Sequence, residues 1–161
     1  MEQKNFQQAI QGFAAFSKKH SEYKLVVVGA GSQREKLLAE AQQSGVADSV
    51  LFTGYLSNPL PLIGKAKGLI LPSRFEGCPN VAMEAAMLNT PLILSSIAAH
   101  RALFDEDMVH YFQLDAPDQT ANALEKTLDK PEPGFKDLLP QWGAELNGLK
   151  YYDIIKKTVT A

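Results

Sequence analysis

Two glutamates, Glu76 and Glu84, enclose a glycine, a proline and an asparagine in the stretch RFEGCPNVAMEA. Pro79 can begin a helix, because its fixed φ suits the first helical turn. Glu84 would then lie about one turn into the helix, and Glu76 on the loop before it. Open N–H groups near Asn80 and Val81 would favour a negative ligand group such as a diphosphate. Because a carboxylate can accept two hydrogen bonds from a vicinal diol, the pattern predicts a sugar-phosphate site. The alternative is two solvated acids that stabilise the helix dipole.

The segment that contains Glu76 and Glu84 lies among short apolar runs. Each of these runs is typical of a buried strand in a parallel sheet. They lie at residues 24–28, 49–53, 68–71 and 91–95, with a weaker run at 109–112. Helical periodicity predicts helices at 4–19, 32–43, 81–88 and 117–128, a short helix or turn at 59–67, and a helical stretch at 136–158. This alternation predicts an α/β fold with a doubly wound parallel sheet. Such sheets bind ligands at the carboxyl ends of their strands, where the acidic segment falls.

Composition narrows the classes of function. The 161 residues carry a net charge of −2, which provides no basic field for nucleic acid. The N-terminus lacks a signal-peptide pattern, and no apolar run approaches the ~20 residues of a membrane span. The three histidines lack metal-ligand spacing, so no metal site is predicted. The single cysteine, Cys78, excludes an internal disulfide and reads as a small space-filling residue rather than a nucleophile. We expect a cytoplasmic protein with no nucleic-acid partner.

Other motifs are weaker. Gly29-Ala30-Gly31 follows a strand, but Arg34 replaces the third glycine of a dinucleotide-binding turn. It could be only a tight turn, or it could border a ligand. Lys4 could be only a surface lysine on the first helical turn. His100 and Arg101 follow a strand end, and we expect ordinary surface roles for them.

The stretch LPSRFEGCPNVAMEAAMLNTPLI resembles the signature of retaining GT-B glycosyltransferases of the group 1 family. QKNF, KLVVVGAGSQREKLLAEA and VLFTGY resemble other family segments, so the resemblance covers about residues 3–129. It implies that residues 1–161 form a single Rossmann-like, nucleotide-sugar-binding domain, the C-terminal half of a GT-B fold, with residues 135–161 as a C-terminal helical segment. The first strand of this domain and the N-terminal partner domain would be missing.

The resemblance also implies roles for individual residues. Glu84 should hold the ribose hydroxyls, Glu76 the hydroxyls of the donor sugar, and Lys4 the diphosphate, which makes Glu76 and Lys4 the candidate catalytic residues. The remaining candidates line the donor through backbone groups. Those expected near the diphosphate and sugar are Gly77, Cys78, Pro79, Asn80 and Val81; those bordering the base are Thr53, Gly54 and Tyr55; those shaping the cleft wall are Gly29 and Gly31.

The function implied is transfer of a hexose-type sugar, with retention at the anomeric carbon, from a nucleotide diphosphate sugar to a glycan or lipid-linked acceptor. That nucleotide sugar is the donor substrate, and no further cofactor is implied. The setting would be bacterial surface polysaccharide or lipopolysaccharide synthesis. The full enzyme could associate peripherally with the inner face of the plasma membrane. The isolated chain should be weak or inactive and could self-associate where the partner domain would dock.

Some residues depart from the family pattern, so other functions stay open. Lys67-Gly68 stands where the family often has Ala-Asp, and residues 98–102 stand where it often has Gly-Gly-x-Pro-Glu. The main alternative is a non-catalytic module that binds nucleotide sugars. An epimerase or hydrolase of the same architecture would need catalytic acids or histidines that this chain does not place. A dinucleotide oxidoreductase is disfavoured by Arg34.

Overall fold

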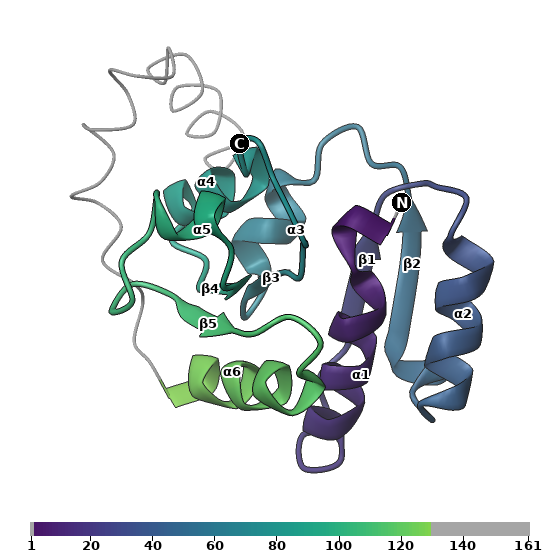
Figure 1. The fold of residues 1–161 in the computed structure, drawn as a ribbon. Helices are drawn as coiled ribbons and strands as arrows, with labels where there is room; N and C mark the ends of the chain where they lie inside the picture. The colour runs from purple at the N-terminus through teal and green to yellow at the C-terminus, as the bar shows by residue number, and fades with distance from the viewer. Residues whose placement is uncertain (1, 130–161) are drawn as a thin grey trace.

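The computed structural model describes residues 2–129, so the helical segment expected at 135–161 lies outside the described residues. The elements alternate along the chain as the apolar pattern predicts (Figure 1). They are η1 (Glu2–Lys4), α1 (Phe6–Ser17), β1 (Leu25–Val28), α2 (Arg34–Gln43), η2 (Ala47–Ser49), β2 (Val50–Gly54), α3 (Leu60–Lys65), β3 (Leu69–Leu71), α4 (Asn80–Met87), β4 (Leu92–Ser95), α5 (Ala98–Arg101), β5 (His110–Phe112) and α6 (Pro117–Asp129).

Every strand pairing in the described residues is parallel, which confirms the predicted fold class. Leu25 lies opposite Val50 in the β1–β2 pair, and β4 pairs with both β3 and β5. The strands fall into two sheets, β1–β2 and β3–β4–β5. All four residues of β4 are buried, as expected for a central strand covered on both faces.

The facing edges of the two sheets, β1 and β3, are not hydrogen-bonded to each other within residues 2–129. An apolar cavity of about 320 Å³ lies beside them, with Val26 and Val28 of β1 and Leu69 and Ile70 of β3 in its lining. Helices α1 and α6 pack against each other nearby and join the two halves (Figure 1). The sheet is therefore interrupted at its middle rather than continuous.

Small residues let helices lie close to their neighbours. Ala82, Ala85 and Ala86 of α4 are fully or almost fully buried against β3 and β4. In α1, a Cβ atom built on Gly12 would lie 2.5 Å from the side chain of Thr120 on α6. Only a residue without a side chain permits this α1–α6 approach.

The first helix and one short helix later in the chain differ from the prediction. The first helix begins at Phe6 rather than at residue 4, because Asn5 adopts the left-handed conformation (φ 48°), and it ends at Ser17. Lys4 therefore lies in the short helix η1. The four-residue helix α5 was not predicted, since so short a segment leaves little periodic signal. No helix within residues 2–129 combines the length and the apolar character needed to cross a bilayer.

Candidate functional site

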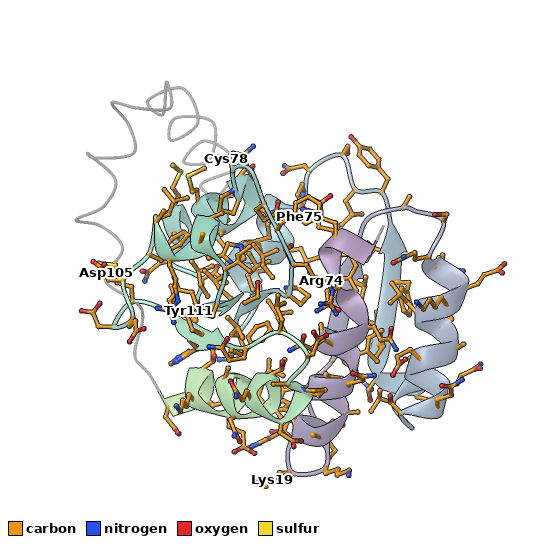
Figure 2. The ribbon with its side chains drawn as sticks, viewed as in Figure 1. Lys19, Arg74, Phe75, Cys78, Asp105 and Tyr111 are labelled. Atoms are coloured by element: carbon orange, nitrogen blue, oxygen red, sulfur yellow. The ribbon has the colours of Figure 1, made fainter. Side chains whose placement is uncertain are left out.

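The loop between β3 and α4 lies against the N-terminal residues of the chain. The Arg74 N–H donates to the Gln3 carbonyl (2.8 Å), and Gln3 Nε2 donates to the Phe75 carbonyl (3.2 Å). Figure 2 labels Arg74, Phe75 and Cys78 along this loop. The N-terminus lies at the end of the molecule where the arrow of β2 ends (Figure 1). Two segments more than 70 residues apart in sequence thus meet at the carboxyl ends of the strands.

Glu76 is the most constrained residue of this loop. Its Oε1 accepts hydrogen bonds from Lys4 Nζ (2.7 Å) and Ser73 Oγ (2.6 Å), and its side chain is 9% exposed. Burial acts to raise the pKa of Glu76, but the hydrogen bonds from Lys4 and Ser73 and the nearby positive charges outweigh it, so the pKa lies below its ordinary value. The structure therefore brings together Glu76 and Lys4, the two candidate catalytic residues. It also pairs them directly, which the sequence analysis did not predict.

The environment of Glu84 shifts its pKa in the direction opposite to that of Glu76. Glu84 is half-buried on α4, and burial raises the pKa of its carboxyl group. Within residues 2–129 its carboxylate has no hydrogen-bond partner. The side chain is therefore not the fully solvated acid of the alternative interpretation, and both of its oxygens are available to hydroxyl groups.

The start of α4 differs in detail from the prediction. Pro79 precedes the first helical residue, Asn80, as expected. However, the Asn80 N–H donates to the Cys78 carbonyl (3.0 Å), so the prediction that this N–H is open is wrong. This bond closes an inverse γ-turn centred on Pro79, whose φ is −82° and ψ is 66°. The exposed Cys78 thiol donates to Asn80 Oδ1 (3.3 Å).

The candidates on β1 and β2 lie close to one another. The Gly29 N–H donates to the Gly54 carbonyl (2.8 Å), and both glycines have positive φ, 126° and 71°, which disfavours any other residue. Thr53 is exposed and donates to the Gly54 carbonyl, while Tyr55 is 79% exposed. The structure thus joins the expected cleft wall to the expected base-binding segment. It does not test the role of either, and Gly31 lies in open surroundings.

Three buried polar residues behind Glu76 were missed by the sequence analysis. Ser73, Ser95 and His100 each have 0% exposure, so the surface role expected for His100 is wrong. The signal that could have identified the serines is a hydroxyl at the end of an apolar strand run. Nothing in the spacing indicated that His100 would turn inward from α5.

Arg74 and Arg101 form ion pairs at the surface. Arg74 pairs with the exposed Asp115 and thereby lowers the pKa of that carboxyl group. Arg101 donates to Ser96 Oγ (2.7 Å) and Glu106 Oε1 (2.6 Å) and stacks over the Tyr111 ring. Arg101 therefore lies at the surface, as expected.

Comparison with known proteins connects this geometry to a family. Residues 1–137 match the family described as glycosyl transferases group 1. The Vi polysaccharide biosynthesis protein VipC/TviE of Salmonella typhi is 32% identical over 109 residues, which are 68% of this chain and 18% of that protein. The chain spans less than half the length of the curated relatives it matches.

Solved structures share the fold. The C-terminal domain of the group 1 family glycosyl transferase LpcC from Francisella tularensis has a TM-score of 0.74 at 18% identity, covering 88% of this chain and 80% of that one. The Anabaena protein Alr3699/HepE, solved in complex with UDP, has a TM-score of 0.79 at 14% identity, covering 99% of this chain and 46% of that one. The match over most of its length shows that this chain belongs to the group 1 family of glycosyl transferases and has the Rossmann-like fold of a GT-B C-terminal domain.

Proposed function

We propose that this chain is the donor-binding half of a retaining glycosyltransferase, which transfers a hexose-type sugar from a nucleotide diphosphate sugar to a glycan or lipid-linked acceptor. The observation that carries the proposal is the contrast between two acids at one strand end. Glu76 is fixed and kept ionised by Lys4 and Ser73, while Glu84 is half-buried with no partner among residues 2–129. The similarity to a polysaccharide biosynthesis protein favours a role in bacterial surface polysaccharide synthesis, in the cytoplasm.

Glu84 suits a ribose. A half-buried carboxylate without a protein partner is costly, and two vicinal hydroxyls would donate to both of its oxygens at once. Tyr55, Thr53 and Gly54 would border the base, and the UDP bound to the structurally similar HepE makes uridine the first base to test. Gly29 and Gly31 would form the wall of the cleft beside them.

Glu76 suits orientation of the sugar rather than attack on it. Its Oε1 already accepts two hydrogen bonds, and its lowered pKa makes it a poor proton donor. This leaves Oε2 for a sugar hydroxyl. Departure of the nucleoside diphosphate places growing negative charge on the leaving oxygen. Lys4 has three donors and uses one of them on Glu76, so its remaining N–H groups could stabilise that charge.

The proposal includes the domain organisation. Within residues 2–129 the edges of β1 and β3 are unpaired and lie beside an apolar cavity, which fits a sheet with room for one more central strand. The polypeptide before Glu2 would emerge at the carboxyl ends of the strands. A strand that ended just before Glu2 would have its carboxyl end at this edge and would therefore run parallel to β1 and β3. The acceptor site would belong to a partner domain across the cleft.

Calorimetric titration of the 161-residue chain with UDP, GDP and ADP and their glucose conjugates tests donor binding. Glu84→Gln should weaken binding of the preferred nucleotide roughly ten- to a hundredfold, because one bidentate charged acceptor is lost. Glu22→Gln, at an exposed position in the turn before β1, is the matched control and should bind like the parent.

Two outcomes would contradict the proposal. Equal affinity in the parent and in Glu84→Gln would remove the ribose role from Glu84. Failure of the parent to bind any of the six ligands would remove donor binding itself. The non-catalytic alternative predicts the same binding but no sugar transfer in the longer protein.

A further inference from the structure

His100 is a fully buried imidazole at the carboxyl end of β4, on the short helix α5. Its Nε2 has no hydrogen-bond partner within residues 2–129. A buried polar atom without a partner is costly, so each instance requires a physical reason. Packing alone does not supply one, because leucine would fill a similar volume without an unpaired nitrogen. The reason must lie in what the other ring nitrogen does.

The other nitrogen anchors the end of β4. His100 Nδ1 lies 2.8 Å from the Ser95 carbonyl oxygen and 3.3 Å from Ser95 Oγ. A carbonyl can only accept, so Nδ1 carries the proton and donates. Ser95 Oγ in turn lies 2.6 Å from the Ser73 carbonyl oxygen and must donate to it. The imidazole of His100 thus fixes Ser95 at the end of β4. The Ser95 hydroxyl in turn holds Ser73, in the loop after β3.

The chain of hydrogen bonds ends on the candidate sugar-binding acid. Ser73 Oγ lies 2.6 Å from Glu76 Oε1 and donates to the carboxylate. Every bond from His100 to Glu76 therefore has a determined direction, and the three inner residues are fully buried. Buried networks of this kind hold their members in one arrangement, because no member can turn without leaving another unpaired. Lys4 is the only other residue within 2–129 that donates to the Glu76 carboxylate.

The electrostatics fit a neutral imidazole. Burial lowers the pKa of His100 below its ordinary value, although the Ser95 carbonyl and the negative charge of Glu76 oppose this. The nearby Lys4 ammonium lowers it further. The ring therefore adds no second cation beside Lys4 at neutral pH, and it acts through its hydrogen bonds rather than through its charge.

We propose that His100 is a positioning residue for Glu76: it holds Ser95, which holds Ser73, which fixes the carboxylate in the orientation that meets the donor sugar. The link to the sugar rests on the proposed function, but the effect on Glu76 does not. The proposal therefore has one test without a ligand and one with a ligand.

The ligand-free test measures the pKa of Glu76 by NMR of its side-chain carboxyl carbon in the 161-residue chain. His100→Leu should raise this pKa, because the Ser73 hydrogen bond loosens while burial remains. His100→Asn retains an N–H donor near the position of Nδ1 and should leave the pKa close to that of the parent. Thr90→Val removes a different buried hydrogen bond, to the Ile63 carbonyl (2.9 Å), and serves as a control for general destabilisation.

An unchanged Glu76 pKa in His100→Leu would overturn the proposal. An equal rise in His100→Asn would also overturn it, since the retained N–H donor to the Ser95 carbonyl would then not be what holds the Glu76 pKa in place. Ser95→Ala covers the case in which His100→Leu does not fold. It removes the bond to Ser73 and leaves His100 in place, so it should raise the Glu76 pKa, and an unchanged value would count against the network.

The ligand test compares UDP with UDP-glucose. His100→Leu should weaken UDP-glucose binding about tenfold with little change for UDP, whereas His100→Asn should match the parent. Equal weakening for both ligands would indicate a structural role only. If the parent binds neither ligand, the proposed function fails, and the pKa of Glu76 still decides the role of His100.

Discussion

Glu76 and Glu84 show how one residue type acquires two chemical characters within eight positions. Hydrogen bonds and a cation keep the first ionised, while burial without partners raises the pKa of the second. Glu125 also pairs with a lysine, Lys19, which lowers its pKa, but both side chains of that pair are more exposed than those of Lys4 and Glu76. Exposed ion pairs contribute little to stability. Replacing Lys4 and replacing Lys19 therefore compares a partly buried ion pair with an exposed one.

Lys4→Met should change the acid sensitivity of the fold. The folded-state pKa of Glu76 lies below its ordinary value of 4.5, so its contribution to stability is present above about pH 4.5 and is lost as the pH falls through the folded-state pKa. Without Lys4, burial opposes a weaker set of hydrogen bonds. The pH dependence in this window should shrink or reverse. Urea unfolding between pH 3 and 7 measures it.

Lys19→Met is the control, because Lys19 and Glu125 form a more exposed pair (2.9 Å). Its pH profile should stay close to that of the parent. A profile for Lys4→Met that overlays the Lys19→Met profile would mean that the Lys4–Glu76 pair contributes no more than a surface ion pair.

At the scale of elements, α1 connects the two halves of the molecule. Gln8 on α1 donates to the Gln113 carbonyl (2.8 Å) and Thr120 Oγ1 (3.1 Å) and accepts from the Asp115 N–H (2.9 Å). One buried amide thus ties α1 both to α6 and to the segment that connects β5 with α6. The contact requires α1 and α6 to approach closely, and Gly12 permits this.

Gly12→Ala should destabilise the chain by about 1–3 kcal/mol, because the added methyl group would overlap Thr120. Gly64→Ala makes the same change on α3, where a Cβ would meet only Leu88 at 3.8 Å. It should be neutral or stabilise by about 0.5–1 kcal/mol, since glycine disfavours helix. Thermal unfolding of both variants distinguishes the two sites. Equal stability would show that α1 and α6 can separate at little cost.

Elements with a strong periodic signal were predictable from the sequence, and those defined by tertiary contacts were not. The β-branched run of β1 and the apolar run of β4 predict strands, and the amphipathic pattern of α1 predicts a helix. The left-handed turn at Asn5 and the helix α5 depend on packing that no local pattern encodes. For the same reason, the two acids could be proposed from their spacing and from the family resemblance, whereas the buried residues that hold Glu76 could not.

At the scale of the whole molecule, the gap between β1 and β3 leaves two strand edges unpaired within residues 2–129. Unpaired strand edges invite pairing with other chains, so the isolated chain should self-associate, which sedimentation at several concentrations measures. A strictly monomeric profile would contradict this expectation. The apolar cavity beside the two edges is the space that a strand pairing with both would have to occupy.

Extending the N-terminus by six apolar, β-branched residues and a short linker should raise the melting temperature. The added strand would fill the cavity and pair with β1 and β3. A gain of about 2–3 kcal/mol corresponds to roughly 5–10 °C for a chain of this size. The same extension with two of its residues replaced by proline is the control. Equal melting temperatures would show that the gap does not accept a strand.

The position of Gln3 against the loop of Arg74 and Phe75 has a practical consequence for handling the protein. Any affinity tag placed ahead of Glu2 would emerge beside Glu76 and could compete with a titrated compound, so purification tags belong at the other terminus. The same placement suits a fluorophore, because a dye attached there would sense occupancy directly through a change in its emission.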